Sequence, residues 1–384
     1  MTGTPSTEWD PRAREVLDDQ IAAYDELRGR CPVAHSEFLG WSVLRHDDVV
    51  RVLDDPQTFS NAVTHRLTVP NGMDAPEHTE FRRINDKYFT PALMDDFEPR
   101  CRAIAADIVD DVPRGVATDL MPAVAEIFAL RVQNAFLGWP ADLEEPLRRW
   151  TAKNRAATLA QDRPAMAAIA VEFDGFIGDL LAVRRQAGDA APKDLTTRLL
   201  GERVWDRPMT DEELVSLLRN WTVGELSTIS ASAGILAHHL AVRPTTQRLL
   251  RDDPTLIGAA NDEILRMDAP LIANRRVTTR PVEVAGQVIG AGEPVTVLWA
   301  SANRDESLFR DPDEFRLDRE PKDNLVYGRG LHSCPGAPLA RLELRVFVEE
   351  FLARTTDISR PSATAPARAH YPGGGFATLP LVLR

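Results

Sequence analysis

The sequence predicts a mainly helical protein with a minor β region and one long central helix. Apolar segments with helical spacing and helical start signals occupy most of the chain before Pro270, and short β-type runs separated by glycines follow it. The central helix is predicted to begin at Thr210, where Glu213 completes a capping box. No proline follows until Pro244, so this helix is long enough to cross a domain.

We expect one domain over residues 1–384, because no break in the chain is long enough to be a flexible linker. The 384 residues are 43% hydrophobic and 27% charged, a composition that fits a globular protein with a large core. Helix-rich parts are predicted at about 76–270 and 335–355, and β-rich parts at about 274–298 and in the C-terminal segment.

Charge and cysteine content exclude several classes of protein. With 45 Lys+Arg and 58 Asp+Glu the net charge is −13, which argues against a nucleic-acid partner. The N-terminus lacks the features of a signal peptide, and no apolar stretch approaches the roughly 20 residues that cross a bilayer. We therefore expect a cytoplasmic protein without a membrane partner. Three cysteines (Cys31, Cys101 and Cys334) are too few for a disulfide scaffold or a four-cysteine zinc site.

Other elements have clear boundary signals. A helix begins with Pro76 in its first turn and extends to about Tyr88, and a helical segment over 120–137 ends at a Gly-Trp-Pro stop. The short β-type runs are Arg276–Thr279, Val282–Val284, Gln287–Ile289 and Pro294–Leu298, followed by an irregular loop over 303–327 and an amphipathic helix over 339–352.

The segment around Cys334 carries the strongest functional signal. Gly328, Gly330 and Gly336 flank this cysteine just before a predicted helix. Glycines let the backbone approach a flat ligand closely, and a helix N-terminus stabilises a thiolate. The pattern favours a thiolate held under a large planar cofactor, and the alternative is a buried cysteine in a glycine-rich turn.

This segment resembles the haem-binding loop of the cytochromes P450, usually Phe-Gly-x-Gly-x-His-x-Cys-x-Gly. The corresponding residues here are Tyr327, Gly328, Gly330, His332, Cys334 and Gly336. Only Tyr327 departs from the pattern, and its phenol would add polarity near the sulfur. The resemblance implies a cytochrome P450 fold with a single large haem domain, haem b (iron protoporphyrin IX) as the cofactor and Cys334 as the iron ligand.

The resemblance extends to a buried pair that holds the segment before the haem loop. Glu263 and Arg266 match the Glu-x-x-Arg of the family. Relatives often have an arginine where this chain has Glu314, so Arg319 or Arg316 is expected to be the third member.

The resemblance also implies which residues bind the haem propionates. His78 and Arg82 stand four residues apart on one helix face and match a His-x-x-x-Arg pair. Arg276 matches a third partner, with Arg275 as the alternative, and His332 completes the set.

The middle of the central helix departs most from the family. Relatives have Ala-Gly-x-(Asp/Glu)-Thr-Thr, whose acid and alcohol relay protons, whereas this chain has Val-Gly-Glu-Leu-Ser-Thr over 223–228. Without a gap, Ser227 takes the place of the threonine and the acid has moved to Glu225. Glu225 and Thr228 are three residues apart and are the other candidate acid–alcohol pair. A polar kink in a core helix is the alternative without chemistry.

The implied function is that of a haem-thiolate monooxygenase. It would insert one atom of O2 into a hydrophobic substrate of small or medium size, aromatic compounds included, by hydroxylation or oxidative O-demethylation. Residues 221–225, 324–328 and 334–341 look most like a bacterial subgroup with self-sufficient members fused to a reductase. Since this chain ends at Arg384, we expect a separate ferredoxin, or a similar iron–sulfur or flavin donor, with an NAD(P)H reductase.

The sequence also offers candidate residues for the site where that donor docks. An arginine patch near the cysteine would suit an acidic ferredoxin, and its candidates are Arg329, Arg341 and Arg345 with Arg82 or Arg83.

Two alternative functions remain. The altered turn in the middle of the central helix also suits an H2O2-dependent peroxygenase, and a non-catalytic haem-binding gas sensor is the second alternative.

Overall fold

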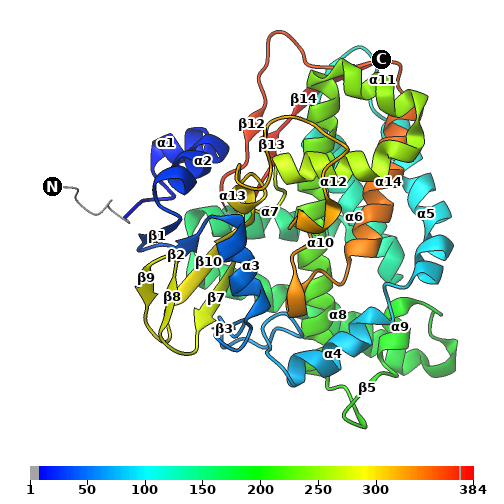
Figure 1. The fold of residues 1–384 in the computed structure, drawn as a ribbon. Coiled ribbons are helices and arrows are strands. Elements are labelled where there is room, and N and C mark those ends of the chain that lie inside the picture. The colour runs from blue at the N-terminus through cyan, green and yellow to red at the C-terminus, as the bar shows by residue number, and fades with distance from the viewer. Residues whose placement is uncertain (1–7, 372) are drawn as a thin grey trace.

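In the computed structural model, which describes residues 8–371 and 373–384, the five-stranded sheet lies at one side of the molecule and most helices at the other (Figure 1). This arrangement agrees with the predicted fold class, mainly α with a minor β region. The helices are α1 (Arg14–Asp18), α2 (Gln20–Arg30), α3 (His46–Asp54), α4 (Glu77–Asp86), α5 (Pro91–Asp110), α6 (Glu126–Leu137), α7 (Glu144–Ala160), α8 (Arg163–Ala187), α9 (Leu195–Leu199), α10 (Asp211–Val242), α11 (Pro244–Asp252), α12 (Ile257–Met267), α13 (Trp299–Ala302) and α14 (Ala337–Ala353).

The longest helix, α10, runs through the middle of the helical part (Figure 1). Its N-terminus has the predicted capping box: the Glu213 N–H donates to Thr210 Oγ1 over 3.2 Å, and the Thr210 N–H donates to Glu213 Oε2 over 2.8 Å. It packs against α6, α8, α12 and α14, which explains why it is apolar on most sides. Among the described residues, no helix is both long enough and apolar enough to cross a membrane.

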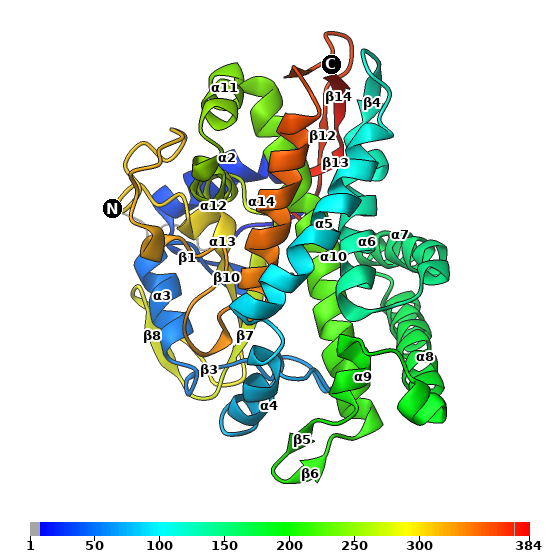
Figure 2. The ribbon, with the colours of Figure 1, turned by 90° about the vertical axis from the view of Figure 1, so that its right-hand side faces the viewer.

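Helices α5 and α14 lie side by side in front of α10 (Figure 2). Helix α14 begins directly after the Cys334 segment, so this packing fixes the position of the cysteine relative to α10. The segment predicted over 120–137 is not one regular helix, because Met121–Ala125 forms a π-helical turn before α6. Pro122 lacks an N–H for the regular ladder, and α6 ends at Gly138 in the left-handed conformation (φ 74°).

The main sheet has the strand order β1-β2-β10-β7-β3, in which β10 is parallel to β2 and the other neighbours are antiparallel. The strands are β1 (Val33–Ser36), β2 (Gly40–Val43), β3 (Phe59–Ser60), β4 (Ala117–Asp119), β5 (Arg203–Val204), β6 (Arg207–Pro208), β7 (Ala273–Thr278), β8 (Val282–Val284), β9 (Gln287–Ile289), β10 (Pro294–Leu298), β11 (Ile358–Ser359), β12 (Ala367–Arg368), β13 (Phe376–Thr378) and β14 (Pro380–Leu383). The runs from β7 to β10 were predicted, whereas β1, β2 and β3 were not. These three strands are short and depend on long-range pairing: β2 pairs with β10, β3 pairs with β7, and β1 pairs with β2 at the edge.

A buried ion pair in α12 holds the irregular segment that follows β10. Arg266 is 1% exposed and binds Glu263 through two hydrogen bonds of 2.8 and 3.0 Å. The same guanidinium donates to Asn303 O over 2.8 Å and to Pro312 O over 2.9 Å. Arg319 is the third member, because its Nε donates to Glu263 Oε1 over 2.9 Å. The network thus ties α12 to the chain that leads into the Cys334 segment.

Arg316 does not fill the third position with its side chain. Its guanidinium binds Asp318, and only its backbone N–H donates to Glu263, over 3.2 Å. Between the two candidates from the sequence, Arg319 is therefore the one whose charge the network uses.

We predict that Arg266→Met lowers the free energy of unfolding by about 3–5 kcal/mol, because it leaves the buried Glu263 carboxylate without its main partner. Chemical denaturation of the haem-loaded protein measures this change. The control is Arg310→Met on the exposed surface, for which a change within about 0.5 kcal/mol is expected. Equal effects of the two substitutions would show that the network does not stabilise the fold.

Candidate active site

Two left-handed glycines and one hydrogen bond shape the segment around Cys334. Gly328 has a φ of 68° and Gly330 a φ of 69°, so a side chain at either would be strained. A Cβ on Gly330 would also lie 2.9 Å from Leu53 O at the end of α3. The Cys334 N–H donates to Tyr327 O over 2.8 Å and closes the turn. The backbone therefore needs these glycines to hold the cysteine beside α3.

The Cys334 sulfur faces a cavity between its own loop and α10. Burial among protein atoms raises the pKa of its thiol, while the backbone N–H groups of Gly336 and Ala337 and the charge of Arg82 act in the opposite direction. A Cβ on Gly336 would lie 3.9 Å from the sulfur, at ordinary van der Waals distance. These donors favour the ionised thiolate. A metal cation bound to the sulfur would displace the proton of the thiol.

The walls of this cavity come from α4, α6, α10, α14 and the Cys334 loop. Apolar and aromatic side chains line much of it, as is usual for sites that bind an organic cofactor. The lining residues from α10 are Asn220, Trp221, Gly224, Glu225, Thr228 and Ile229, and those from the facing side are Cys334, Pro335, Gly336, Ala340 and Glu343. The cavity thus brings the cysteine and the polar middle of α10 together.

The predicted propionate partners form a cluster of two histidines and two arginines near the Cys334 loop. The rings of His78 and His332 are 4.2 Å apart, and His78 Nδ1 and His332 Nε2 are buried without a hydrogen-bond partner. Arg276 is 6% exposed and donates only to a backbone carbonyl, while no carboxylate forms an ion pair with it in the described part of the chain. Arg82 donates to Ser333 O over 2.6 Å and also binds Asp86.

Burial is the main cause of the lowered pKa values in this cluster. Burial, followed by neighbouring cations, lowers the pKa of His78 to about 4 and that of His332 to about 3, so both rings are neutral at pH 7. Burial also lowers the pKa of Arg276 to about 10, while the charge of Asp74 acts in the opposite direction. Orphaned histidine nitrogens and a buried arginine without an ion pair, near the Cys334 thiol, fit a planar ligand with carboxylates on its edge, which is the chemistry of haem.

Strand geometry separates Arg276 from its alternative, Arg275. Successive side chains of β7 point to opposite faces, so only one of the two can face inward. Arg275 is exposed and donates to Phe38 O over 3.3 Å, whereas Arg276 is buried. Arg276 is therefore the one of the two that lies inside, where its charge acts on His332.

The two hydroxyls of the α10 centre differ in their surroundings. Thr228 lines the cavity and donates to Gly224 O over 2.6 Å, while Ser227 donates to Val223 O over 3.1 Å and is not among the cavity-lining residues. Glu225 lines the cavity too, and burial raises the pKa of its carboxyl to about 8, but no hydrogen bond links it to Thr228 in the described structure. The three-residue spacing thus places Glu225 and Thr228 on one wall without joining them.

Sequence analysis missed Glu343 and Gln133, which surround Glu225. Glu343 is fully buried on the inner face of α14, and Gln133 is 1% exposed in α6. A signal for Glu343 was present, since a glutamate interrupts the apolar face of that amphipathic helix nine residues after Cys334. The sequence contains no signal for Gln133, because its proximity to α10 depends on how α6 packs.

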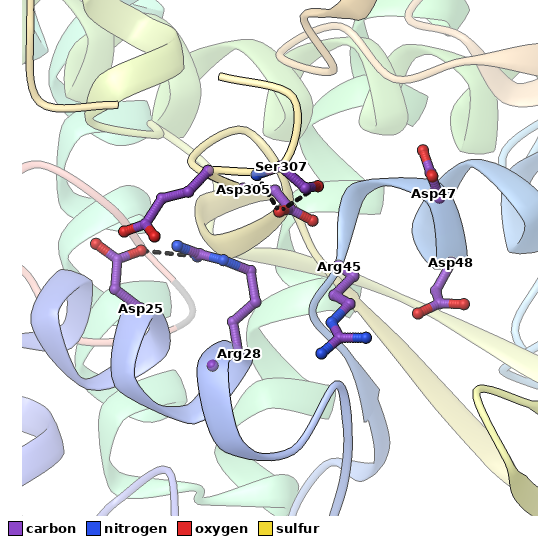
Figure 3. Close-up of a pocket in the computed structure, with 9 residues that line it drawn as sticks. Asp25, Arg28, Arg45, Asp47, Asp48, Asp305 and Ser307 are labelled. Carbon is purple, nitrogen blue, oxygen red and sulfur yellow. Dashed lines mark hydrogen bonds and ion pairs between the residues drawn. The ribbon is translucent and has the colours of Figure 1, made fainter. Parts of the chain in front are cut away.

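A second hollow lies between α2, α3 and the segment after α13 (Figure 3). Its walls are polar and charged, and the carboxylates of Asp25 and Asp305 are already bound: Arg28 donates to Asp25 over 2.7 Å, and Ser307 Oγ donates to Asp305 over 2.7 Å. It holds no cysteine, histidine or aromatic side chain. The cavity at Cys334 is therefore the candidate active site.

Comparison with known proteins agrees with this geometry. A family model described as Cytochrome P450 matches residues 156–356. Nocardicin C N-oxygenase of Nocardia uniformis subsp. tsuyamanensis is 34% identical over 331 residues, covering 82% of this chain and 81% of that enzyme. Erythromycin C-12 hydroxylase of Saccharopolyspora erythraea is 32% identical over 358 residues, covering 88% of each chain.

A solved structure extends the similarity to the fold. The open form of cytochrome P450 EryK from S. erythraea has a TM-score of 0.87 and 28% identity, covering 96% of this chain and 97% of that one. Because the matched region includes Cys334 and the relatives cover most of the chain, this protein belongs to the cytochrome P450 family.

Proposed function

We propose that this cytochrome P450 inserts one oxygen atom of O2 into a hydrophobic substrate, with electrons from a separate redox protein. The observation that carries the proposal is the position of Thr228 and Glu225, which line the same cavity as the Cys334 sulfur. A peroxide-only enzyme needs no proton supply for O2 reduction, so protic groups on this wall favour the monooxygenase over the peroxygenase.

Haem, the cofactor of the family, would supply the oxygen activation when bound. Cys334 would be its iron ligand, in a turn shaped by Gly328 and Gly330. His78, Arg82, Arg276 and His332 would bind the propionates, and the Tyr327 ring, with the Arg341 guanidinium 4.4 Å from its centre, would close the loop side. The Thr228 hydroxyl, which donates to Gly224 O in this structure, would rotate to donate its proton into the cavity, and the Glu225 carboxyl on the same wall would replace that proton.

The substrate class is argued from the cavity wall and from the relatives. Phe89, Phe136 and Trp221 offer apolar contact, and Asn71 and Asn220 offer amides for orientation. Relatives are named for hydroxylation of erythromycin and N-oxygenation of nocardicin C. We therefore propose hydroxylation of a hydrophobic secondary metabolite as the main reaction, and oxidative O-demethylation of an aryl ether as the second.

The proposed electron donor is a ferredoxin or a similar iron–sulfur or flavin protein with an NAD(P)H reductase. All five arginines predicted for docking have an acidic partner: Arg82 with Asp86, Arg83 with Glu80, Arg329 with Asp54, Arg341 with Asp262, and Arg345 with Glu98 and Glu349. This face is therefore mixed in charge rather than a free basic patch, and an acidic partner must compete with these carboxylates. The likeness to the reductase-fused subgroup and the cytoplasmic location stay predictions from the sequence.

We predict that the reduced, CO-bound protein shows the long-wavelength Soret band of thiolate-ligated haem, and that Cys334→Ser abolishes it. The absorption spectrum of the haem-loaded protein measures this. Cys31→Ser is the matched control, because Cys31 is buried elsewhere and donates to Val33 O. A thiolate band that survives in Cys334→Ser would contradict the assignment.

We predict that Thr228→Val diverts electrons from product to hydrogen peroxide, lowering the product formed per NAD(P)H by about tenfold or more. Ser227→Ala, one residue away, should stay within about twofold, because Ser227 is outside the cavity wall. Product and peroxide are measured with surrogate redox partners and a substrate found by its spin-state shift. A larger loss in Ser227→Ala would reassign the alcohol.

We predict that Arg276→Gln weakens haem binding by roughly 10- to 100-fold, since it removes a hydrogen bond between charged groups. Haem transfer from the loaded protein to an apoglobin acceptor gives the rate of loss. The neighbouring change Arg275→Gln on the exposed face of β7 is the control. The propionate role would be refuted by equal rates in the two variants.

A further inference from the structure

A tryptophan side chain forms part of the wall of the active-site cavity. Trp221 of α10 lines the same cavity as the Cys334 sulfur and is 9% exposed. Its ring N–H donates to Asn85 Oδ1 of α4 over 3.2 Å. This bond also fixes the Asn85 amide, because an indole N–H can only donate. A side chain that is readily oxidised is therefore held beside the place where oxygen chemistry is proposed.

Tyr88 continues from Trp221 toward the protein surface. The centres of the two rings are 5.4 Å apart and their planes are tilted by 55°, so the rings are in contact. Tyr88 is 0% exposed, and its hydroxyl donates to Glu202 Oε1 over 3.1 Å. Glu202 directly precedes β5, and its side chain is 15% exposed. Two aromatic rings and one carboxylate thus connect the cavity with the surface.

The charged groups around Tyr88 provide an acceptor for its proton. Glu202 is the anion of an ion pair, because Lys87 Nζ donates to its Oε2 over 2.6 Å. Burial, followed by the charge of Glu202, raises the pKa of Tyr88, so the phenol keeps its proton at neutral pH. A tyrosine that loses an electron becomes a strong acid, and Glu202 is within hydrogen-bond reach of that proton. The Arg198 guanidinium, 5.1 Å from the ring centre, opposes the loss of the electron.

We propose that Trp221 and Tyr88 form an electron-transfer path that removes oxidising equivalents from the cavity when no substrate consumes them. Trp221 gives one electron to the oxidant in the cavity, and Tyr88 gives one electron to Trp221. The Tyr88 O–H bond breaks as its proton moves to Glu202. Trp221 is thereby restored, and Tyr88 is left as a neutral radical.

The complete reaction needs an oxidant in the cavity and a reductant outside it. The oxidant is hydrogen peroxide, and the reductant that restores Tyr88 is a small one-electron donor of the ascorbate class. Glu202 releases its proton to solvent, while the cavity takes up one proton for each electron. Two electrons break the O–O bond, so one hydrogen peroxide and two ascorbate monoanions give two waters and two ascorbyl radical anions. The reaction rests on the proposed haem site but not on the insertion of oxygen into a substrate.

A second tryptophan–tyrosine pair offers a matched control. The ring centres of Trp9 and Tyr24 are 6.1 Å apart, and the Tyr24 hydroxyl donates to Gln20 Oε1 over 3.3 Å. Tyr24 is 1% exposed, but neither ring belongs to the wall of the active-site cavity. This pair therefore has the same side chains without the connection to the cavity.

Electron paramagnetic resonance tests the path. The haem-loaded protein is mixed with hydrogen peroxide in the absence of substrate and frozen rapidly. We expect a tyrosyl radical signal that Tyr88→Phe abolishes, Trp221→Phe reduces strongly and Tyr24→Phe leaves unchanged. Tyr327, next to the Cys334 loop, is the competing site for the radical. Absence of the signal in the wild type, its persistence in Tyr88→Phe or its loss in Tyr327→Phe alone overturns the proposal.

Glu202→Gln tests the proton acceptor, because an amide accepts a proton poorly. It should reduce the tyrosyl signal, whereas Lys87→Gln removes the ion pair but keeps the carboxylate and should retain the signal. Equal signals in Glu202→Gln and the wild type would overturn the role of Glu202.

A further measurement follows survival of the haem Soret band in hydrogen peroxide with ascorbate present. Tyr88→Phe should lose the band faster than the wild type, and Tyr24→Phe at the wild-type rate. Equal rates in all three proteins would show that the path removes no oxidising equivalents. The CO spectrum of Tyr88→Phe reports thiolate-ligated haem independently of these radicals. Failure of the path and failure of the proposed function are therefore distinguishable.

Discussion

The buried Glu263–Arg266 pair is the interaction on which the active site depends. It satisfies its own charges and, through Arg266 and Arg319, also binds the carbonyls of the irregular chain between β10 and the Cys334 loop. That chain has little regular structure of its own, so its path has to be fixed by side chains from elsewhere. A rigid path brings the loop to α14 and places Cys334 opposite α10.

Unbalanced charge distinguishes the active site from the rest of the molecule. Most arginines elsewhere are paired with carboxylates, including those around the cysteine face. By contrast, Arg276 is buried near His78 and His332 without an ion pair, and Glu225 and Glu343 line the cavity without a cationic partner among the described residues. The first feature suits the carboxylates of haem, and in the second burial raises the pKa of both carboxyl groups. Burying ionisable groups without partners lowers the stability of the fold, and a role in the active site explains why they are present.

Parts of the site that depend on short sequence patterns were predictable. The Cys334 loop, the Glu263–Arg266 pair and the helix at His78 each lie within a few residues, where glycine conformation or helical spacing fixes the geometry. The choice between Ser227 and Thr228, or between Arg275 and Arg276, was not predictable. Adjacent residues on a helix or strand differ only in the face they present, and packing decides which face is inward.

By itself, the sequence determined the mainly helical fold, the long capped helix α10 and the cysteine as the centre of the chemistry, because caps, glycines and spacing act over short distances. Only the tertiary structure decided that β1, β2 and β3 join the sheet, that Arg319 completes the network, and that Glu343 of α14 lines the same cavity as Glu225 of α10. These arrangements bring together residues far apart in the chain, so they depend on how helices and strands pack and not on any short sequence pattern.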